Sequence, residues 1–140
     1  MSTSIEQLLF DYIKGIAELQ TLLGGSSSNY KIYPVEAPDD AVAPYIVYKT
    51  AFDGRTGEIM KMITVMLTIV VPADYSDAVE IRDVLDNNLD VDDQISLSSS
   101  AIVVRNIVKN GGSPDSQDKD TRELIKVVNY DVLYTKTKGA

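Results

Sequence analysis

Apolar residues recur every three or four positions along the first part of the chain. This spacing lays one apolar stripe along a helix and leaves the opposite side polar. A hydroxyl of Ser2, Thr3 or Ser4 can cap the first turn, and Gly24 is a typical helix end. The pattern predicts one helix over residues 4–23, buried along one side. The stripe consists of Ile5, Leu8, Leu9, Tyr12, Ile13, Ile16, Leu19 and Leu23.

The middle of the chain alternates between two kinds of side chain, as a half-buried strand does. Residues 45–52 and 59–71 predict two strands, and the turn residues 53–57 join them into a long hairpin. The second strand is far longer than the roughly five or six residues of an average strand. We therefore expect its outer end, with Met60 and Met62, to project beyond the sheet as an arm. One face of this strand carries Ile63, Val65, Leu67, Ile69 and Val71, and the other carries Thr64, Met66 and Thr68.

The same two periodicities, three to four residues for a helix and two for a strand, predict the remaining elements. Residues 30–34 predict a short extended piece, and residues 76–89, with Ser76 as the cap, predict a second helix. Residues 101–109 and 123–135 predict the last two strands. The inward side of the helix is expected to consist of Ala78, Ile81, Val84 or Leu85, and Leu89. One face of the final strand carries Leu124, Val128, Tyr130, Val132 and Tyr134.

The segment 110–120 separates the last two strands. It contains Gly111-Gly112, which predicts a turn, followed by Ser113-Pro114 and several charges. Such residues offer neither core contacts nor partners in a sheet. We therefore predict residues 111–120 to be the most mobile internal segment.

These elements define the expected fold class. Their order is α-β-β-β-α-β-β, without βαβ alternation. The fold class is α+β, with a mostly antiparallel sheet and two helices packed on one face. A chain of 140 residues with 44% hydrophobic residues can bury one core. We expect one domain over residues 1–140.

Charge narrows the choice of partners. The formal net charge is −8. Binding to nucleic acid or to anionic membranes depends on Lys and Arg, so neither is expected as the main activity. Acidic residues gather between residues 74 and 93, where Arg82 is the only cation. This run is either a solvated helix face or a surface that repels nucleic acid. Its candidate residues are Asp77, Glu80, Asp83 and Asp86.

The sequence contains few residue types that commonly act in catalysis or metal binding. The sequence has no histidine and no cysteine, which removes the commonest general base, the serine and cysteine triads and thiolate metal ligands. Asp90, Asp92 and Asp93 suggest calcium, but Ile95 and Leu97 stand where further ligands would be needed. We expect no catalytic residues, no metal and no cofactor. No secretion signal is readable at the N-terminus, so a cytoplasmic origin is the default.

A short motif in the middle of the chain resembles phage tail-completion or tail-terminator proteins. It consists of Lys31-Ile32-Tyr33-Pro34, a loop, and then Ala43-Pro44-Tyr45-Ile46-Val47-Tyr48. A strand ending in Thr68-Ile69-Val70-Val71-Pro72 and a helix start at Tyr75-Ser76-Asp77-Ala78 follow in the same order. The resemblance covers about residues 1–90. The acidic end of the second helix and the loop 110–121 depart from the family pattern.

The resemblance implies a structural virion protein without enzymatic activity. Family members form a ring, usually hexameric, that caps the head-proximal end of the tail tube, ends tube polymerisation and joins tail to head. The implied partners are copies of itself, the tail-tube protein and the head–tail connector protein. The implied location is the virion tail, after assembly in the bacterial host cytoplasm. DNA would pass through the ring without specific binding. An acidic channel wall, for which residues 74–93 are one candidate, would let the DNA pass freely, and the outer rim of the ring is an equally open place for these residues.

Three further functions stay open at this stage, and one of them is a carboxylate-dependent enzyme. Within the same apparatus, the protein could be a head–tail connector (neck) subunit. From another class, it could be a cytoplasmic acidic binding module or inhibitor that blocks a basic partner. For assembly, the candidate interface residues are Met60, Met62 and Met66, because methionine is flexible and suits a surface that must fit a neighbour.

Overall fold

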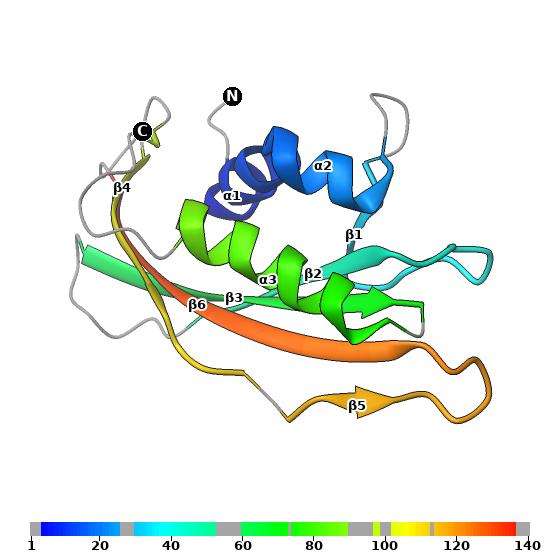
Figure 1. Ribbon diagram of the computed structural model, residues 1–140. Coiled ribbons are helices and arrows are strands. Elements are labelled where there is room, and N and C mark those ends of the chain that lie inside the picture. The colour runs from blue at the N-terminus through cyan, green and yellow to red at the C-terminus, as the bar shows by residue number, and fades with distance from the viewer. Residues whose placement is uncertain are drawn as a thin grey trace.

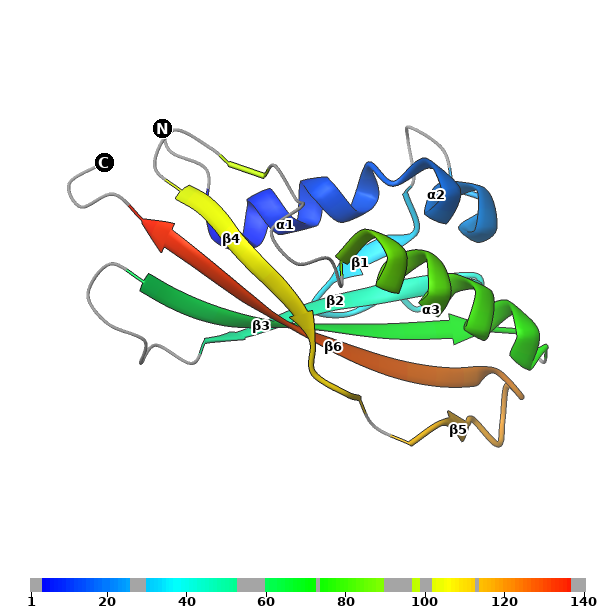
Figure 2. The same cartoon turned by 60° about the vertical axis from the view of Figure 1, so that its left-hand side comes forward.

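The computed structural model describes residues 4–25, 30–52, 60–72, 74–89, 97–98, 102–112 and 114–136. Three helices lie on one face of a six-stranded sheet, and no described element covers the other face (Figures 1 and 2). The α+β class and the placement of the helices are confirmed. In chain order the elements are α1 (Ile5–Lys14), α2 (Ala17–Leu23), β1 (Ile32–Pro34), β2 (Tyr45–Phe52), β3 (Met60–Val71), α3 (Tyr75–Leu89), β4 (Ile102–Lys109), β5 (Ser116–Gln117) and β6 (Leu124–Lys136).

The helix predicted over residues 4–23 is interrupted. Ser4 caps α1, its hydroxyl accepting from the Gln7 N–H at 3.1 Å. Gly15 ends α1, and Ile16 then takes an extended conformation before α2 begins. Glycine has a low helix propensity, which makes it a weak point of a continuous helix. The apolar stripe survives the break, because Ile13, Ile16, Leu19 and Leu23 are all buried.

The cap of α3 differs from the predicted one. The helix begins at Tyr75, and it is the Asp74 carboxylate that accepts from the Ser76 N–H (3.0 Å) and the Ser76 hydroxyl (2.7 Å). A carboxylate is a stronger acceptor than a hydroxyl and also interacts favourably with the helix dipole. These hydrogen bonds lower the pKa of Asp74, with the bond from the Ser76 hydroxyl as the largest cause.

The strands are ordered β1-β2-β3-β6-β4 in the sheet, and β5 also pairs with β6. The predicted hairpin is confirmed: β2 and β3 are antiparallel, from Tyr45 opposite Val70 to Phe52 opposite Ile63. Among the described strands, only β1 and β2 pair in parallel. They are the two strands of the family-like motif, and Ile32 lies opposite Ile46 and Pro34 opposite Tyr48. The two halves of the motif are therefore one structural unit.

The prediction that the start of β3 projects beyond the sheet as an arm is wrong. Met60 lies opposite Thr135 and Met62 opposite Leu133, so β6 pairs with β3 along its whole length. A strand this long needs an equally long partner to satisfy its backbone. The last strand of the chain provides it.

The expectation that residues 111–120 have no sheet partner is also wrong. Ser116 and Gln117 form β5, opposite Ile125 and Leu124. The Asp118 carboxylate accepts from the N–H groups of Asp120 (2.8 Å) and Thr121 (3.2 Å), which closes the turn into β6. The mobility of the segment remains a prediction.

Gly111-Gly112 is a place of close approach and not a turn. The Asn129 N–H donates to the Gly111 carbonyl at 3.0 Å, so the chain continues along the same edge of β6 that β4 occupies. A Cβ atom on Gly112 would lie 2.0 Å from the Val127 carbonyl oxygen. Only glycine allows the two backbones to come this close.

The core lies between the helices and the inner face of the sheet. As predicted, alternate residues of β3 and β6 are buried there, together with the helix stripes. Among the described residues, no polar or charged residue is buried, and no helix combines the length and apolar character that crossing a bilayer needs. The largest fully buried side chains are Tyr130, Leu9, Ile13, Leu19, Leu23, Ile46, Ile63, Leu67, Ile69, Ile81, Leu85 and Leu89.

Candidate interaction surfaces on the two sides of the sheet

The outer face of the sheet carries an apolar surface without a described cover. Residues that alternate with the buried ones point to this side. An antiparallel sheet with one free face usually presents polar residues there. Here every long strand contributes apolar side chains, most of them half-buried or exposed, and exposed apolar patches are typical of protein contacts. They are Tyr45 and Val47 on β2, Met62, Met66 and Val70 on β3, Ile125, Val127 and Leu133 on β6, and Val103 and Val108 on β4; Val70 alone is largely buried.

The candidate methionines lie in one row on this outer face. Met60, Met62 and Met66 are all half-buried. The register sets Met62 beside Leu133 and Met66 beside Asn129. The structure thus brings the three onto one surface, although not onto an arm. Their contact with another copy stays a hypothesis.

A polar band crosses the outer face between its two apolar ends. The Thr64 hydroxyl donates to the Asp131 carboxylate at 2.8 Å, and Lys49 lies opposite Met66. The side-chain oxygens of Asn106 and Asn129 are buried, yet have no hydrogen-bond partner within the described residues. Buried acceptors without a donor are uncommon in folded proteins.

The acidic candidates on α3 do not share one surface. Asp77, Glu80 and Asp83 are exposed. Asp86 instead points to the sheet, where its carboxylate accepts from the Tyr130 hydroxyl (2.5 Å) and from the Lys109 ammonium group (2.9 Å). Asp86 therefore ties α3 to the sheet. Its spacing in the sequence matches the exposed acids and gave no sign of this role.

A second polar cluster ties the β5 edge to the start of α3. The Asp115 carboxylate accepts from the Tyr75 hydroxyl (2.6 Å) and from the Lys126 ammonium group (3.0 Å). The hydrogen bond from Tyr75, followed by the one from Lys126, lowers the pKa of Asp115. Sequence reasoning did not connect these three residues, because they are far apart in the chain. The cluster fixes structure and leaves no carboxylate free for a ligand.

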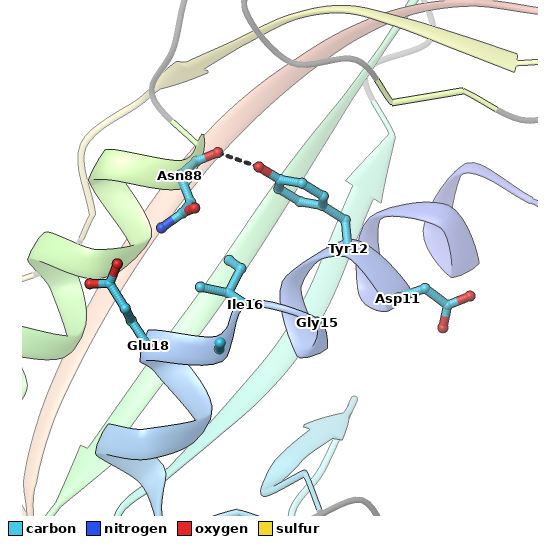
Figure 3. Close-up of a pocket in the computed structure, with 7 residues that line it drawn as sticks. Asp11, Tyr12, Gly15, Ile16, Glu18 and Asn88 are labelled. Carbon is cyan, nitrogen blue, oxygen red and sulfur yellow. Dashed lines mark hydrogen bonds between the residues drawn. The ribbon is translucent and has the colours of Figure 1, made fainter.

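Two hollows lie on the helical side of the molecule. The first has a volume of about 480 Å³ and lies where the α1–α2 corner faces the end of α3 (Figure 3). Tyr12 bridges the two walls, its hydroxyl donating to the Asn88 carbonyl at 2.9 Å. Burial raises the pKa of the Tyr12 hydroxyl. The second hollow, of about 390 Å³, lies between α2 and α3 and is lined by Glu18, Thr21, Leu22, Glu80, Asp83 and Val84.

These surfaces combine apolar and polar side chains. The described part of the chain holds no group of three or more Asp and Glu residues that could bind a metal ion. The hollows combine carboxylates with apolar side chains, and the sheet face combines apolar side chains with amides. Both are typical of contacts between proteins.

Comparison with known proteins shows a likeness in fold. No protein-family model matches the sequence, and no curated protein matches it. The fold, however, is that of a known virion chain. The match is to a chain in a solved structure described as the virion of a native gene transfer agent particle, with a TM-score of 0.70. The alignment covers 94% of this chain and 95% of that chain at 9% sequence identity, so the likeness is one of fold.

Proposed function

We propose that this protein is a structural virion subunit that forms a ring at the head-proximal end of a phage tail tube. The ring ends tube polymerisation and joins the tail to the head. The observation that carries the proposal is the fold likeness to a gene transfer agent virion chain, which extends over nearly the whole of both chains. The family-like motif supports it independently, because its two halves pair as β1 and β2.

The outer face of the sheet offers the contact that such a ring needs. A ring forms when one surface of each subunit binds a different surface of the next and the rotation closes. Met60, Met62 and Met66 present flexible apolar side chains on this face, and Val103 and Val108 extend it to the edge strand β4. Subunits in such a ring would bury these side chains against a neighbour or against the tube.

The proposal assigns the protein partners but no reaction. The partners are other copies, with a hexamer expected, the tail-tube protein and the head–tail connector protein. The protein would reside in the virion tail, and DNA would pass the ring without specific binding. Neither cofactor nor catalytic residue is part of this function.

The assembly is tested by solution mass. The wild type is expected to form a discrete multimer, alone or with tail-tube protein, and Met62→Asp is expected to weaken it because a charge would enter the contact. Val42→Asp is the matched control: Val42 is 70% exposed in the loop before β2. A wild type that stays monomeric at high concentration with tail-tube protein present would contradict the ring. Normal assembly of Met62→Asp would mean that the contact between subunits lies on another surface.

Electron microscopy of particles made without this protein separates a terminator from a neck subunit. Without a terminator, tube polymerisation has no stop, so tails of uncontrolled length are expected. Tails of normal length that fail to join heads would instead assign the protein to the neck.

A further inference from the structure

The two hollows on the helical side adjoin each other, and together they are called the furrow below. Both are lined by Glu18, which stands at their junction on α2. Along α3 the lining extends from Glu80 to Asn88, which corresponds to about 12 Å at the helical rise of 1.5 Å per residue. The furrow thus runs between α1 and α2 on one side and α3 on the other. Its length matches about two turns of a bound helix.

The furrow has an acidic rim. Asp11, Glu18, Glu80 and Asp83 line it, and neither hollow is lined by Lys or Arg. Asp11 has Lys14 nearby at 3.2 Å and Asp83 has Arg82 at 2.8 Å. Glu18 and Glu80 have no ion-pair partner among the residues that the structure describes.

The floor of the furrow is apolar. Leu22 and Val84 face each other from α2 and α3 and are only partly buried, although both pack against the core. Ile16 continues this floor at the corner between α1 and α2 (Figure 3). An apolar floor between two helices with charged walls is the kind of site that holds an amphipathic segment.

We propose that this furrow binds a basic amphipathic segment of another protein. Lys or Arg side chains of that segment would pair with Glu18 and Glu80, and an apolar side chain between them would pack on Leu22 and Val84. Charge complementarity argues for this occupant, since an acidic rim repels phosphates and acidic surfaces and attracts cations. The site lies on the opposite side of the sheet from the proposed ring contact and does not depend on it.

The test uses a fluorescent synthetic helix of Lys and Leu residues whose binding is followed by anisotropy. The variant Glu18→Gln/Glu80→Gln removes the two carboxylates without partners. The control Glu36→Gln/Asp39→Asn makes the same change in net charge in the exposed loop before β2. Loss of two surface ion pairs should weaken binding to the first variant about three- to thirtyfold, more at low salt than at high salt. The control should bind as the wild type does.

Several results would overturn the proposal. Equal weakening in both variants would mean that the peptide senses only the overall charge. Equal binding of a peptide with Ser in place of Leu would mean that the apolar floor takes no part in binding. Self-association that is lost in Glu18→Gln/Glu80→Gln but kept in Met62→Asp would make a second copy the occupant. Circular dichroism melting checks that both variants fold, as expected for exposed Glu-to-Gln changes.

Discussion

The two faces of the sheet are built from the same strands and carry many of the same residue types, but they differ in what covers them. On β3 the residues at odd positions from Ile63 to Val71 are buried beneath the helices, whereas Met62, Thr64, Met66 and Thr68 are only half-buried. The side chains of the inner face are buried when this chain folds. The outer face has no cover among the described elements.

Tyrosine side chains sharpen the difference. On the covered side, the Tyr48 hydroxyl donates to the Glu6 carbonyl of α1 at 2.9 Å, and Tyr130 donates to Asp86 of α3. Burial, with a smaller contribution from Glu6, raises the pKa of Tyr48 far above its usual value. On the open side, Tyr33 and Tyr45 pack edge to face, with ring centroids 5.9 Å apart. Buried tyrosines hold the helices in place, and outer ones provide half-exposed aromatic surface.

The largest expected effect comes from truncating neighbouring residues on opposite faces. Leu67→Ala should lower the free energy of unfolding by about 2–5 kcal/mol, because Leu67 is fully buried and a cavity would remain. Met66→Ala, one residue away and half-buried on the outer face, should cost less than about 1 kcal/mol in the isolated subunit. Urea denaturation of both variants measures this. Similar costs would mean that the outer face also supports the monomer.

Much of this comparison could be predicted from the sequence. Period-2 alternation in β3 and β6 identified the inner residues, and the spacing in α1, α2 and α3 identified the stripes that cover them. The break after Lys14 could not be read, because Ile16 continues the stripe on either side of it. Likewise, alternation shows that Met62 and Met66 share a face but does not say whether a helix covers that face.

Contacts between residues that are distant in the sequence could not be predicted either. The pairing of Tyr130 with Asp86 and of Lys126 with Asp115 depends on how β6 lies under α3 and beside β5. Charge patterns along the chain carry no such information. For the same reason the furrow rim was missed in part: Glu18 belongs to α2, and only the fold places it near Glu80.

A smaller effect is expected when one hydroxyl is removed. Tyr130→Phe should destabilise the protein by about 1.5–3 kcal/mol, the range for hydrogen bonds to charged groups, since Asp86 would lose a donor at a part-buried site. Tyr45→Phe is the control on the outer face, where the described residues provide no hydrogen bond to the hydroxyl; its cost should stay within about 0.5 kcal/mol. Thermal and urea unfolding compare the two. A near-zero cost for Tyr130→Phe would mean that packing alone holds α3.

The smallest expected effect depends on pH and concerns the margin of the covered side, where Lys126 and Tyr75 hold Asp115. The pKa of Asp115 is lowered from its usual 3.8 in the folded state. Its stabilising contribution is therefore fully present above that value and is lost as pH falls through the lower folded pKa. The side chain is 38% exposed, so solvent screening keeps the contribution below about 1 kcal/mol. The difference in unfolding free energy between wild type and Asp115→Asn should be constant from about pH 5 to 7 and should shrink below pH 4. Asp39→Asn, in the exposed loop before β2, should match the wild type throughout. A difference that persists unchanged at the acid end would mean that Asp115 acts through packing and not through its charge.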